Sequence, residues 1–409
     1  AGAMADAESA EMPASIAAEP NVAEKLRGRK FWEAIGSPKL VAAPMVDQSE
    51  LAFRMLCRRY GTQLAYTPMI HSRLFATQPK YRKDQWSTCP EDRPLFAQFC
   101  GDDPQTLVDA ARQLPAGEFD AVDLNCGCPQ GIARKGHYGA YLLSEPDLIE
   151  SIVRRLDTEL PVPVTVKIRL VSTDAELQDT LNLASRLEAA GASALCLHGR
   201  TKEMKGQNTG PCNWDAIAAV RRRVGIPMIA NGGIQTFDDV DRCLAATGCD
   251  AVMSSEALLE RPTLFAGTSG PAPFQEDIAL EYLELAKLYK PSGKCTKAHL
   301  FHFLYAGLQL HTDLRSQLGG AKGIDEMAVI TAALKARRAE NRAAGFKWPE
   351  TGWYTRYREP LGERGGGKKR KADAISKGGD AVIAADEPPE QPGPIYGANV
   401  VPDSGKEPA

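Results

Sequence analysis

The chain has 409 residues, of which 43% are hydrophobic and 25% charged, and its formal net charge is −3. A chain of this size can bury a large core and still form a second domain. No apolar run is long enough to cross a bilayer, so we expect no membrane association. Ten cysteines without the spacing of a disulfide framework indicate reduced thiols, and we expect a cytoplasmic or nuclear protein, or one found in both compartments.

The chain repeats one pattern from Lys39 to about residue 257. Residues 1–24 are rich in alanine and glutamate and are predicted to be a disordered leader. Thereafter a short apolar run, a polar or glycine-containing loop and an amphipathic helix alternate. The eight predicted strands are Leu40–Met45, Leu64–Met69, Pro94–Cys100, Ala121–Cys126, Pro163–Leu170, Ala194–Arg200, Pro227–Gly233 and Ala251–Ala257.

Eight buried strands alternating with helices predict an α/β fold, a (β/α)8 TIM barrel, over residues 25–289. A doubly wound sheet is the structural alternative. The glycine fingerprint that opens such a sheet is absent from this sequence, which favours the barrel.

The pattern changes after residue 289, where we expect a smaller all-helical domain over residues 290–345. Helices are predicted at Lys297–Leu318 and Glu326–Ala344, separated by Gly319 and Gly320. This segment has nine basic and four acidic residues, an excess that is typical of a nucleic-acid-binding surface.

Residues 346–409 are predicted to form a largely disordered tail, basic at first and then acidic. The basic run Lys368–Lys371 has three interpretations that the sequence leaves open: a nuclear import signal, an additional RNA contact or a solvated linker.

TIM-barrel enzymes carry their chemistry at the carboxyl ends of the strands. Polar residues recur at these positions here, which packing alone does not explain. They are Asp47, Gln48, Gln98, Asn125, Cys128, Lys167, Arg169, His198, Arg200 and Asn231.

The last two strand ends suggest a phosphate site. Gly232 and Gly233, with Ser254 and Ser255, offer backbone N–H groups to an anion, although glycines in a tight turn are the alternative. With Lys167 in the mouth, the better interpretation is a bound flavin mononucleotide (FMN), because a cation stabilises the anionic reduced flavin. A buried, paired Lys167 is the alternative.

The loop after the fourth strand carries Cys128, a candidate reactive thiol, whereas a buried structural cysteine is the alternative. We expect Cys126 to be a packing residue. The spacing of Cys126 and Cys128 does not match a zinc pair, and no second pair follows, so no metal site is predicted.

Two motifs carry a family resemblance. Asn125-Cys126-Gly127-Cys128-Pro129, followed by Gly139-Ala140-Tyr141-Leu142-Leu143, resembles the signature of the tRNA-dihydrouridine synthases, and the resemblance extends over about residues 39–342. It implies an FMN-dependent barrel with a helical tRNA-binding domain. The implied reaction reduces the C5=C6 bond of uridine, with a hydride from reduced flavin to C6, a proton from Cys128 to C5, and NADPH or NADH as reductant.

The resemblance also implies the cofactor residues. The flavin is expected on the turn Ala43-Pro44-Met45. Its ring and ribityl chain would contact Gln98, Lys167 and His198, and its phosphate would meet Asn231, Gly232, Gly233, Ser254 and Ser255.

One loop departs from the common pattern of the family. Many members have Gly-Arg where this chain has Ser254-Ser255-Glu256, which resembles the eukaryotic branch that acts on D-loop uridines 16 and 17. The predicted substrate-binding residues are Asn125, Arg134, Lys135, Arg200, Lys297 and Arg315. For Arg315, a role in capping a helix or balancing its dipole is as well supported by the sequence as a contact with RNA. We expect tRNA and a nicotinamide dinucleotide as partners, and a monomer.

Two other functions remain open from the sequence. A flavin barrel that reduces a small free pyrimidine or enone would use the same cofactor residues but has no need of a basic helical domain. A non-catalytic RNA-binding protein would need neither Cys128 nor Lys167, and both are present.

Overall fold

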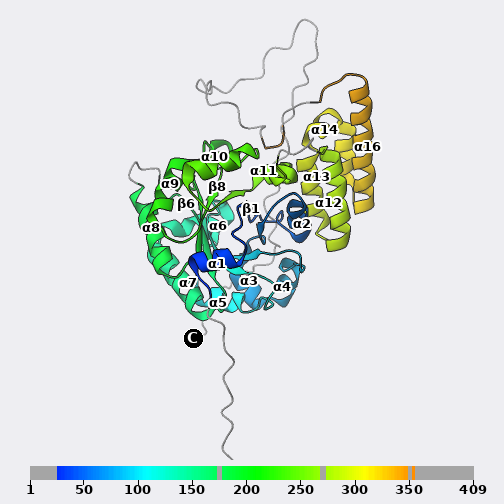
Figure 1. Ribbon diagram of the computed structural model, residues 1–409. Helices are drawn as coiled ribbons and strands as arrows, with labels where there is room; N and C mark the ends of the chain where they lie inside the picture. The colour runs from blue at the N-terminus through cyan, green and yellow to red at the C-terminus, as the bar shows by residue number, and fades with distance from the viewer. Residues whose placement is uncertain (1–24, 173–176, 268–272, 349–351, 355–409) are drawn as a thin grey trace, which may run out of the picture.

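The computed structural model describes residues 25–172, 177–267, 273–348 and 352–354. A barrel of parallel strands surrounded by helices forms one part, and a bundle of helices stands beside it (Figure 1). The predicted leader 1–24 and the basic run Lys368–Lys371 lie outside the described residues. None of the described helices combines the length and the apolar character needed to cross a membrane.

The strands confirm the predicted barrel. They are β1 (Leu40–Ala42), β2 (Leu64–Tyr66), β3 (Ile70–His71), β4 (Leu95–Cys100), β5 (Ala121–Cys126), β6 (Val164–Arg169), β7 (Ala194–His198), β8 (Met228–Asn231) and β9 (Ala251–Ser254). The order is β2-β1-β9-β8-β7-β6-β5-β4-β3, and β2 also pairs with β4, which closes the sheet. A doubly wound sheet stays open and is therefore excluded. The short strand β3, which was not predicted, adds to the end of β4.

Helices follow the strands in chain order. Those of the barrel part are α1 (Gly28–Ala34), α2 (Leu51–Arg59), α3 (Ser72–Thr77), α4 (Pro79–Gln85), α5 (Pro104–Ala111), α6 (Gly131–Lys135), α7 (Pro146–Glu159), α8 (Gln178–Ala189), α9 (Trp214–Arg223), α10 (Asp238–Thr247) and α11 (Glu256–Glu260). Short 3-10 turns are η1 (Gly139–Ser144), η2 (Gly206–Asn208) and η3 (Pro262–Phe265). The bundle consists of α12 (Gln275–Tyr289), α13 (Gly293–Phe303), α14 (Tyr305–Leu310), α15 (Thr312–Gly320) and α16 (Ile324–Ala343).

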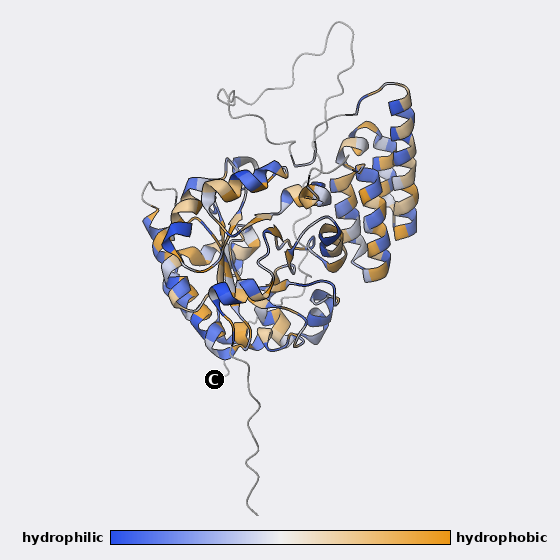
Figure 2. Cartoon of the chain, in the orientation of Figure 1, coloured by the Kyte–Doolittle hydropathy of each residue, from blue (hydrophilic) through white to orange (hydrophobic). Residues whose placement is uncertain are grey.

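The barrel is a packed core and not a pore. Helix α1 places Phe31 and Trp32 against inward-facing side chains of the strands, and Phe31 stacks on Phe96 with ring centroids 5.8 Å apart. Helix α7, for example, buries one face with Ile149, Ile152, Val153 and Leu156, and Figure 2 shows both hydrophilic and hydrophobic residues along the surrounding helices. Because α1 precedes β1, it fills the end of the barrel where the strands begin, and the opposite end is left for the site.

The single helix predicted at Lys297–Leu318 is wrong. The chain leaves helical geometry at Leu304 and again at His311, where φ is −108° and ψ is 71°, so three helices replace one. The predicted pair Gly319 and Gly320 ends α15 instead of separating the helices. The breaks let Leu308, Leu314 and Leu318 all join the core. The second predicted helix matches α16 within two residues at each end.

A buried cluster joins the bundle to the loop after β1. The Glu50 carboxylate accepts a hydrogen bond from Tyr282 Oη at 2.8 Å and lies 2.9 Å from His299 Nε2. The His299 ring stacks on Phe53 with centroids 4.6 Å apart. Cys295 Sγ also donates to the carbonyl oxygen of Asp47 at 2.9 Å. Helices α12 and α13 are thereby fixed to the segment between β1 and α2.

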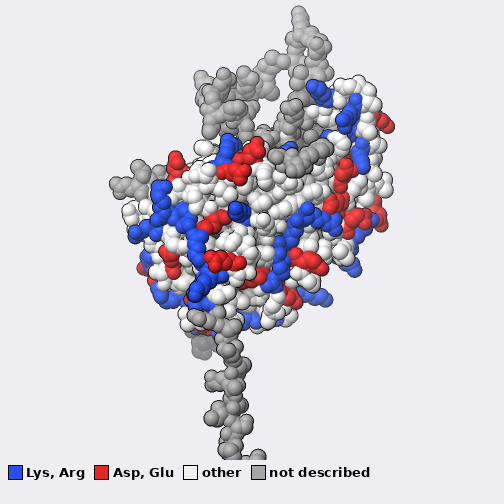
Figure 3. Space-filling model, in the orientation of Figure 1, with Lys and Arg blue, Asp and Glu red and all other residues white. Residues whose placement is uncertain are grey.

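The basic excess of residues 290–345 is partly balanced within the bundle. Helix α12 contributes four acidic residues and one basic residue, so α12 to α16 together have only a small net positive charge. Two of the basic side chains of α16 form ion pairs with α12, Lys335 with Asp277 and Arg338 with Glu276. On the face shown in Figure 3, basic and acidic side chains are intermixed.

A buried ion-pair network fastens α2 to the loop before β4, and it provides a test of the fold. Asp92 is fully buried, and its carboxylate accepts hydrogen bonds from Arg54 Nε at 2.8 Å and from Arg58 Nε at 2.8 Å. Asp92→Ala leaves these guanidinium groups without their carboxylate, and we expect it to lower the free energy of unfolding by about 3–5 kcal/mol.

Urea unfolding of the full chain measures this change. Asp84→Ala, which removes an exposed carboxylate paired with Lys80, is the matched control and should leave the unfolding midpoint unchanged. Equal midpoints for the two variants would contradict the importance of the buried network.

Candidate active site

The carboxyl ends of the strands bring most of the predicted site residues together. Neighbouring strands of the closed sheet present them in turn around one mouth. They are Met45 and Pro44 after β1, Ser254 and Ser255 at β9, Asn231, Gly232 and Gly233 at β8, His198 at β7, Lys167 in β6, Asn125 in β5 and Gln98 in β4. This arrangement agrees with the expected position of the site.

Hydrogen bonds hold the loop that carries Cys128. Asn125 Oδ1 accepts from the backbone N–H of Gly127 at 3.1 Å and from that of Cys128 at 3.0 Å. On the other side, the N–H of Ala140 donates to the Cys128 carbonyl at 3.0 Å. Gly139 has φ +69°, and a Cβ there would lie 2.8 Å from that carbonyl oxygen. Glycine at 139 therefore allows the close approach that supports this loop.

Asn125 was predicted to contact substrate. In the structure both polar atoms of its side chain bond to other residues of the protein. Nδ2 donates to Gln98 Oε1 at 2.7 Å, and Oδ1 accepts from the backbone of the Cys128 loop. Asn125 is 6% exposed. The substrate role stays a prediction, and the contacts in the structure are those of a residue that supports the Cys128 loop.

The thiol of Cys128 lies in a partly buried, positively charged environment. Burial raises its pKa above the ordinary value, and the nearby charges of Arg169, Lys167 and Lys205 oppose that rise. The net result is a thiol that keeps its proton at neutral pH. Cys126, by contrast, is fully buried in the core outside the barrel, which agrees with a packing residue.

Lys167 is an inward-facing ammonium in β6. Its Nζ donates to Asn231 Oδ1 at 2.8 Å, and Asn231 Nδ2 donates to the Met253 carbonyl at 3.1 Å. Burial lowers the pKa of Lys167. An ammonium has three N–H donors, and Asn231 takes one of them, so the remaining donors can serve a ligand.

His198 is held as a neutral imidazole. Burial and the charges of Arg169, Lys167 and Arg200 lower its pKa well below the usual value. Arg200 Nη1 lies 3.0 Å from His198 Nε2. A guanidinium can only donate, so Nε2 accepts and the ring proton is on Nδ1. His198 can therefore donate a hydrogen bond from Nδ1.

The glycines after β8 are required by close packing. Gly232 has φ +103°, and a Cβ at this position would approach Cys212 Sγ and His198 Cδ2 to 2.9 Å. Trp214 Nε1 donates to the Gly232 carbonyl at 3.0 Å. Ser254 is buried, and its hydroxyl donates to the Ile234 carbonyl at 3.2 Å. The loops after β8 and β9 are thus tied together at the place predicted for a phosphate.

Sequence reasoning missed a buried carboxylate inside the barrel. Asp123 is fully buried and receives hydrogen bonds from Gln98 Nε2 at 2.8 Å and from Thr165 Oγ1 at 2.6 Å. Burial raises the pKa of Asp123 to about 6. The alternation of side chains along β5 could have revealed it, because Asp123 and Asn125 point to one face of the strand and Leu124 points to the other.

The remaining predicted substrate residues are spread over two regions. Arg134 and Lys135 are exposed in α6, next to the Cys128 loop. Lys297 and Arg315 lie on the bundle, in α13 and α15, and Lys297 Nζ donates to the Gly319 carbonyl at 2.8 Å. Near the mouth, Lys202 and Lys205 follow β7 and add further positive charge.

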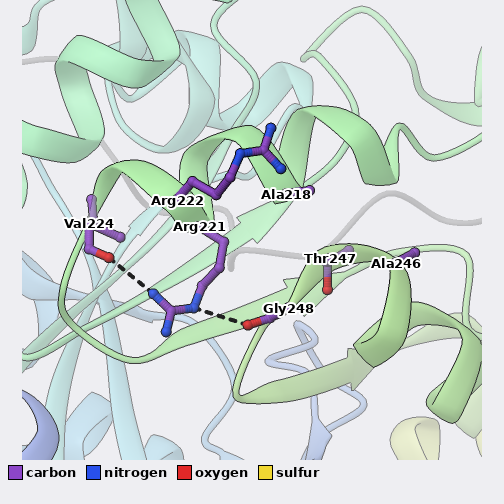
Figure 4. Close-up of a pocket in the computed structure, with 7 residues that line it drawn as sticks. All are labelled: Ala218, Arg221, Arg222, Val224, Ala246, Thr247 and Gly248. Carbon is purple, nitrogen blue, oxygen red and sulfur yellow. Dashed lines mark hydrogen bonds between the residues drawn. The ribbon is translucent and has the colours of Figure 1, made fainter.

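Two further features involve none of the predicted site residues. Glu50, Cys295 and His299 bring potential metal-ligand atoms within 4.8 Å of one another, but hydrogen bonds to protein partners already engage them. A surface depression between α9 and α10 lies at the end where the strands begin. There Arg221 donates to the carbonyls of Val224 and Gly248, whereas Arg222 points away (Figure 4). All ten cysteines are free thiols, as predicted.

Comparisons with known proteins agree with these observations. A family model described as "Dihydrouridine synthase (Dus)" matches residues 40–313. The chain is 46% identical to a mouse "tRNA-dihydrouridine(16/17) synthase [NAD(P)(+)]-like" protein, over 78% of this chain and 66% of that protein. It is 43% identical to the fission yeast "tRNA-dihydrouridine(16/17) synthase [NAD(P)(+)]", over 79% of this chain and 84% of the relative. A human "tRNA-dihydrouridine(20a/20b) synthase [NAD(P)+]-like" protein is 38% identical over 56% of this chain and 70% of its own length.

The raised pKa of Cys128 leads to a test by alkylation. Only the thiolate reacts with iodoacetamide, so the alkylation rate rises as the pH passes the pKa of the thiol. Because the pKa of Cys128 is raised, we expect the midpoint of this rise above about pH 8.5, the pKa of an unperturbed thiol. Mass spectrometry of the Cys128 peptide follows the rate, and the buried Cys126 in the same peptide should stay unmodified.

Removal of a neighbouring charge provides the second arm of this experiment. Lys205 lowers the pKa of Cys128, so Lys205→Met should move the midpoint further upward. A midpoint below about 8 in the unmodified chain would show that the positive neighbours outweigh burial.

Proposed function

Because the chain belongs to the dihydrouridine synthase family, we propose that it reduces the C5=C6 bond of uridine in tRNA to give dihydrouridine. The observation that carries this proposal is the placement of a protonated thiol, Cys128, at a barrel mouth that also contains a buried ammonium, Lys167. The chain spans 66% of the length of the mouse relative and 84% of the fission yeast relative.

The donors at the mouth suit a flavin, and we propose FMN. Lys167 offers N–H donors beyond the one used by Asn231, and Gln98 has a second N–H beyond the one used by Asp123. The loops at Gly232, Gly233, Ser254 and Ser255 would hold the phosphate, and the turn at Pro44 and Met45 would support the ring system. When bound and reduced, the flavin supplies a hydride to C6 of uracil.

Cys128 supplies the proton in this proposal. Its thiol donates to C5 of the uracil, so that hydride and proton together complete the reduction of the double bond. The high pKa keeps the proton available at neutral pH, and the charges of Lys167, Arg169 and Lys205 favour the thiolate that remains. NADPH or NADH is the proposed reductant, in line with the names of the relatives.

Basic loops around the mouth support tRNA as the substrate. Arg134 and Lys135 lie in α6, directly after the Cys128 loop. Lys205 Nζ donates to the Pro129 carbonyl of that loop, and Lys202 lies over the Tyr141 ring. A uridine in folded RNA must leave its stack to reach a barrel mouth, which costs a few kcal/mol, and contacts with phosphates offset this cost. Lys297 and Arg315 of the bundle are proposed to add RNA contacts.

Uridines 16 and 17 are the proposed targets. The relatives named for these positions are 43–46% identical to this chain over more than three quarters of its length. The human relative named for positions 20a and 20b is 38% identical over little more than half of it. A small free pyrimidine or enone is disfavoured as substrate, because it would leave the basic loops at the mouth without a role.

The proposed acid is tested by Cys128→Ala. We expect the variant to keep its flavin spectrum and to form dihydrouridine in unmodified tRNA about 10²–10⁴ times more slowly, since general acid catalysis contributes that much. Nucleoside mass spectrometry measures the product and mapping gives its position.

Cys126→Ala is the matched control for this variant, because Cys126 packs outside the barrel, and it should retain most of the activity. If Cys128→Ala worked as fast as the unmodified chain, another group would have to supply the proton.

The basic loop is tested by the double variant Arg134→Ala/Lys135→Ala. We expect weaker binding of tRNA and a salt dependence of log Kd that is shallower by about one to two, because each lost phosphate contact lowers the slope by about one.

The control removes two arginines at the other end of the barrel. Arg222→Ala/Arg223→Ala takes away the same charge at the end of α9, where Arg222 lines the depression in Figure 4, and should leave the salt slope unchanged. Equal effects of both double variants would mean that net charge, and not the mouth, governs binding.

A further inference from the structure

A continuous chain of hydrogen bonds crosses the barrel interior to the Cys128 loop. It begins at Asp123 in β5, whose Oδ1 accepts from Thr165 Oγ1 at 2.6 Å and whose Oδ2 accepts from Gln98 Nε2 at 2.8 Å. Thr165 belongs to β6 and Gln98 to β4, so both neighbouring strands hold the carboxylate in place. All three side chains are buried.

The chain continues through two amides. Gln98 Oε1 accepts from Asn125 Nδ2 at 2.7 Å. Asn125 Oδ1 then accepts from the backbone N–H groups of Gly127 at 3.1 Å and Cys128 at 3.0 Å. Three successive links, the last of them a pair of hydrogen bonds, therefore connect a carboxylate in the barrel core to the backbone of the loop that carries the thiol.

The direction of this chain is fixed at both ends. An ionised carboxylate only accepts hydrogen bonds, so Gln98 must turn its NH₂ group toward Asp123 and its carbonyl toward Asn125. Backbone N–H groups only donate, so Asn125 must turn its carbonyl toward Gly127 and Cys128. Each amide then has one orientation that satisfies both of its neighbours.

We propose that Asp123 is a positioning residue that fixes the amide orientation of Gln98 and, through Asn125, the backbone of the Cys128 loop. The roles of Gln98 and Cys128 in this proposal rest on the proposed function, whereas the hydrogen-bond chain does not. The orientation has a consequence for specificity. With its NH₂ group turned toward Asp123 and its carbonyl toward Asn125, Gln98 has one N–H left for a ligand, and that N–H requires an acceptor on the ligand edge that it meets.

Burial of this carboxylate works against stability. Burial opposes ionisation of Asp123 and raises its pKa to about 6, although Lys167 and the hydrogen bonds favour the charged form. An apolar side chain of the same size would avoid this cost. What the carboxylate contributes is a fixed acceptor at the start of the chain.

Amide hydrogen exchange in the full-length protein tests the proposal directly. Asp123→Leu removes the acceptor and keeps the number of side-chain heavy atoms, and we expect exchange at the Gly127 and Cys128 N–H groups to accelerate by about tenfold. Asp123→Asn removes the charge but keeps an acceptor for Gln98 and a donor for Thr165, so exchange should stay within about threefold of the unmodified chain. Asp109→Leu, at an exposed carboxylate of α5, is the matched control.

The outcomes are distinct. Unchanged exchange in Asp123→Leu would overturn the proposal, and equal acceleration in Asp123→Asn would overturn it by assigning the effect to charge. If Asp123→Leu does not fold, Gln98→Met breaks the chain in its middle and should accelerate exchange at the same two N–H groups. Unchanged exchange in Gln98→Met would show that the chain of hydrogen bonds does not support the loop.

A kinetic readout separates positioning from folding. Asp123→Leu should lower the maximal rate of product formation by about tenfold or more, with little change in the tRNA concentration for half-maximal rate, and Asp123→Asn should restore it. If the unmodified chain bound no flavin or formed no dihydrouridine, the proposed function would fail, yet the exchange comparison would still decide whether Asp123 positions the loop.

Discussion

Closure of eight parallel strands into one barrel is the constraint on which the site depends. The pairing of β2 with both β1 and β4 closes the sheet, so all strands end at the same mouth. Residues from Pro44 to Ser255, distant in sequence, are thereby brought to one place. At the other end, Phe31 and Trp32 of α1 fill the barrel, so the strands that carry the polar residues rest on a packed core.

Charge at the mouth follows from this closure. Lys167 and Arg169 come from β6 and Arg200 follows β7, and burial together with these three charges holds His198 neutral. Arg169 and Lys167 also lie near Cys128, whose burial still keeps the thiol protonated. A neutral acid in a positive environment suits a reaction that leaves a thiolate behind, and positive loops outside it suit a polyanion.

The sequence allowed the barrel to be predicted because each strand is a short apolar run bounded by loop residues. The predicted strands were longer than the observed ones. Leu40–Met45, for example, yields β1 at Leu40–Ala42, and a turn follows at residues 46–48. The two breaks in the helix predicted at Lys297–Leu318 could not be read from periodicity, because they depend on packing between helices. Asp123 was missed for a similar reason, since only the register of β4, β5 and β6 reveals its partners Gln98 and Thr165.

An anaerobic single-turnover measurement tests the central claim most directly. The purified chain would be reduced with NADPH, and reoxidation of its flavin would be followed by absorbance after addition of unmodified tRNA or of free uridine. The account predicts rapid reoxidation by tRNA and none by uridine, because the basic loops at the mouth are needed to deliver the base. Reoxidation by uridine as fast as by tRNA, or indifference to both, would contradict it.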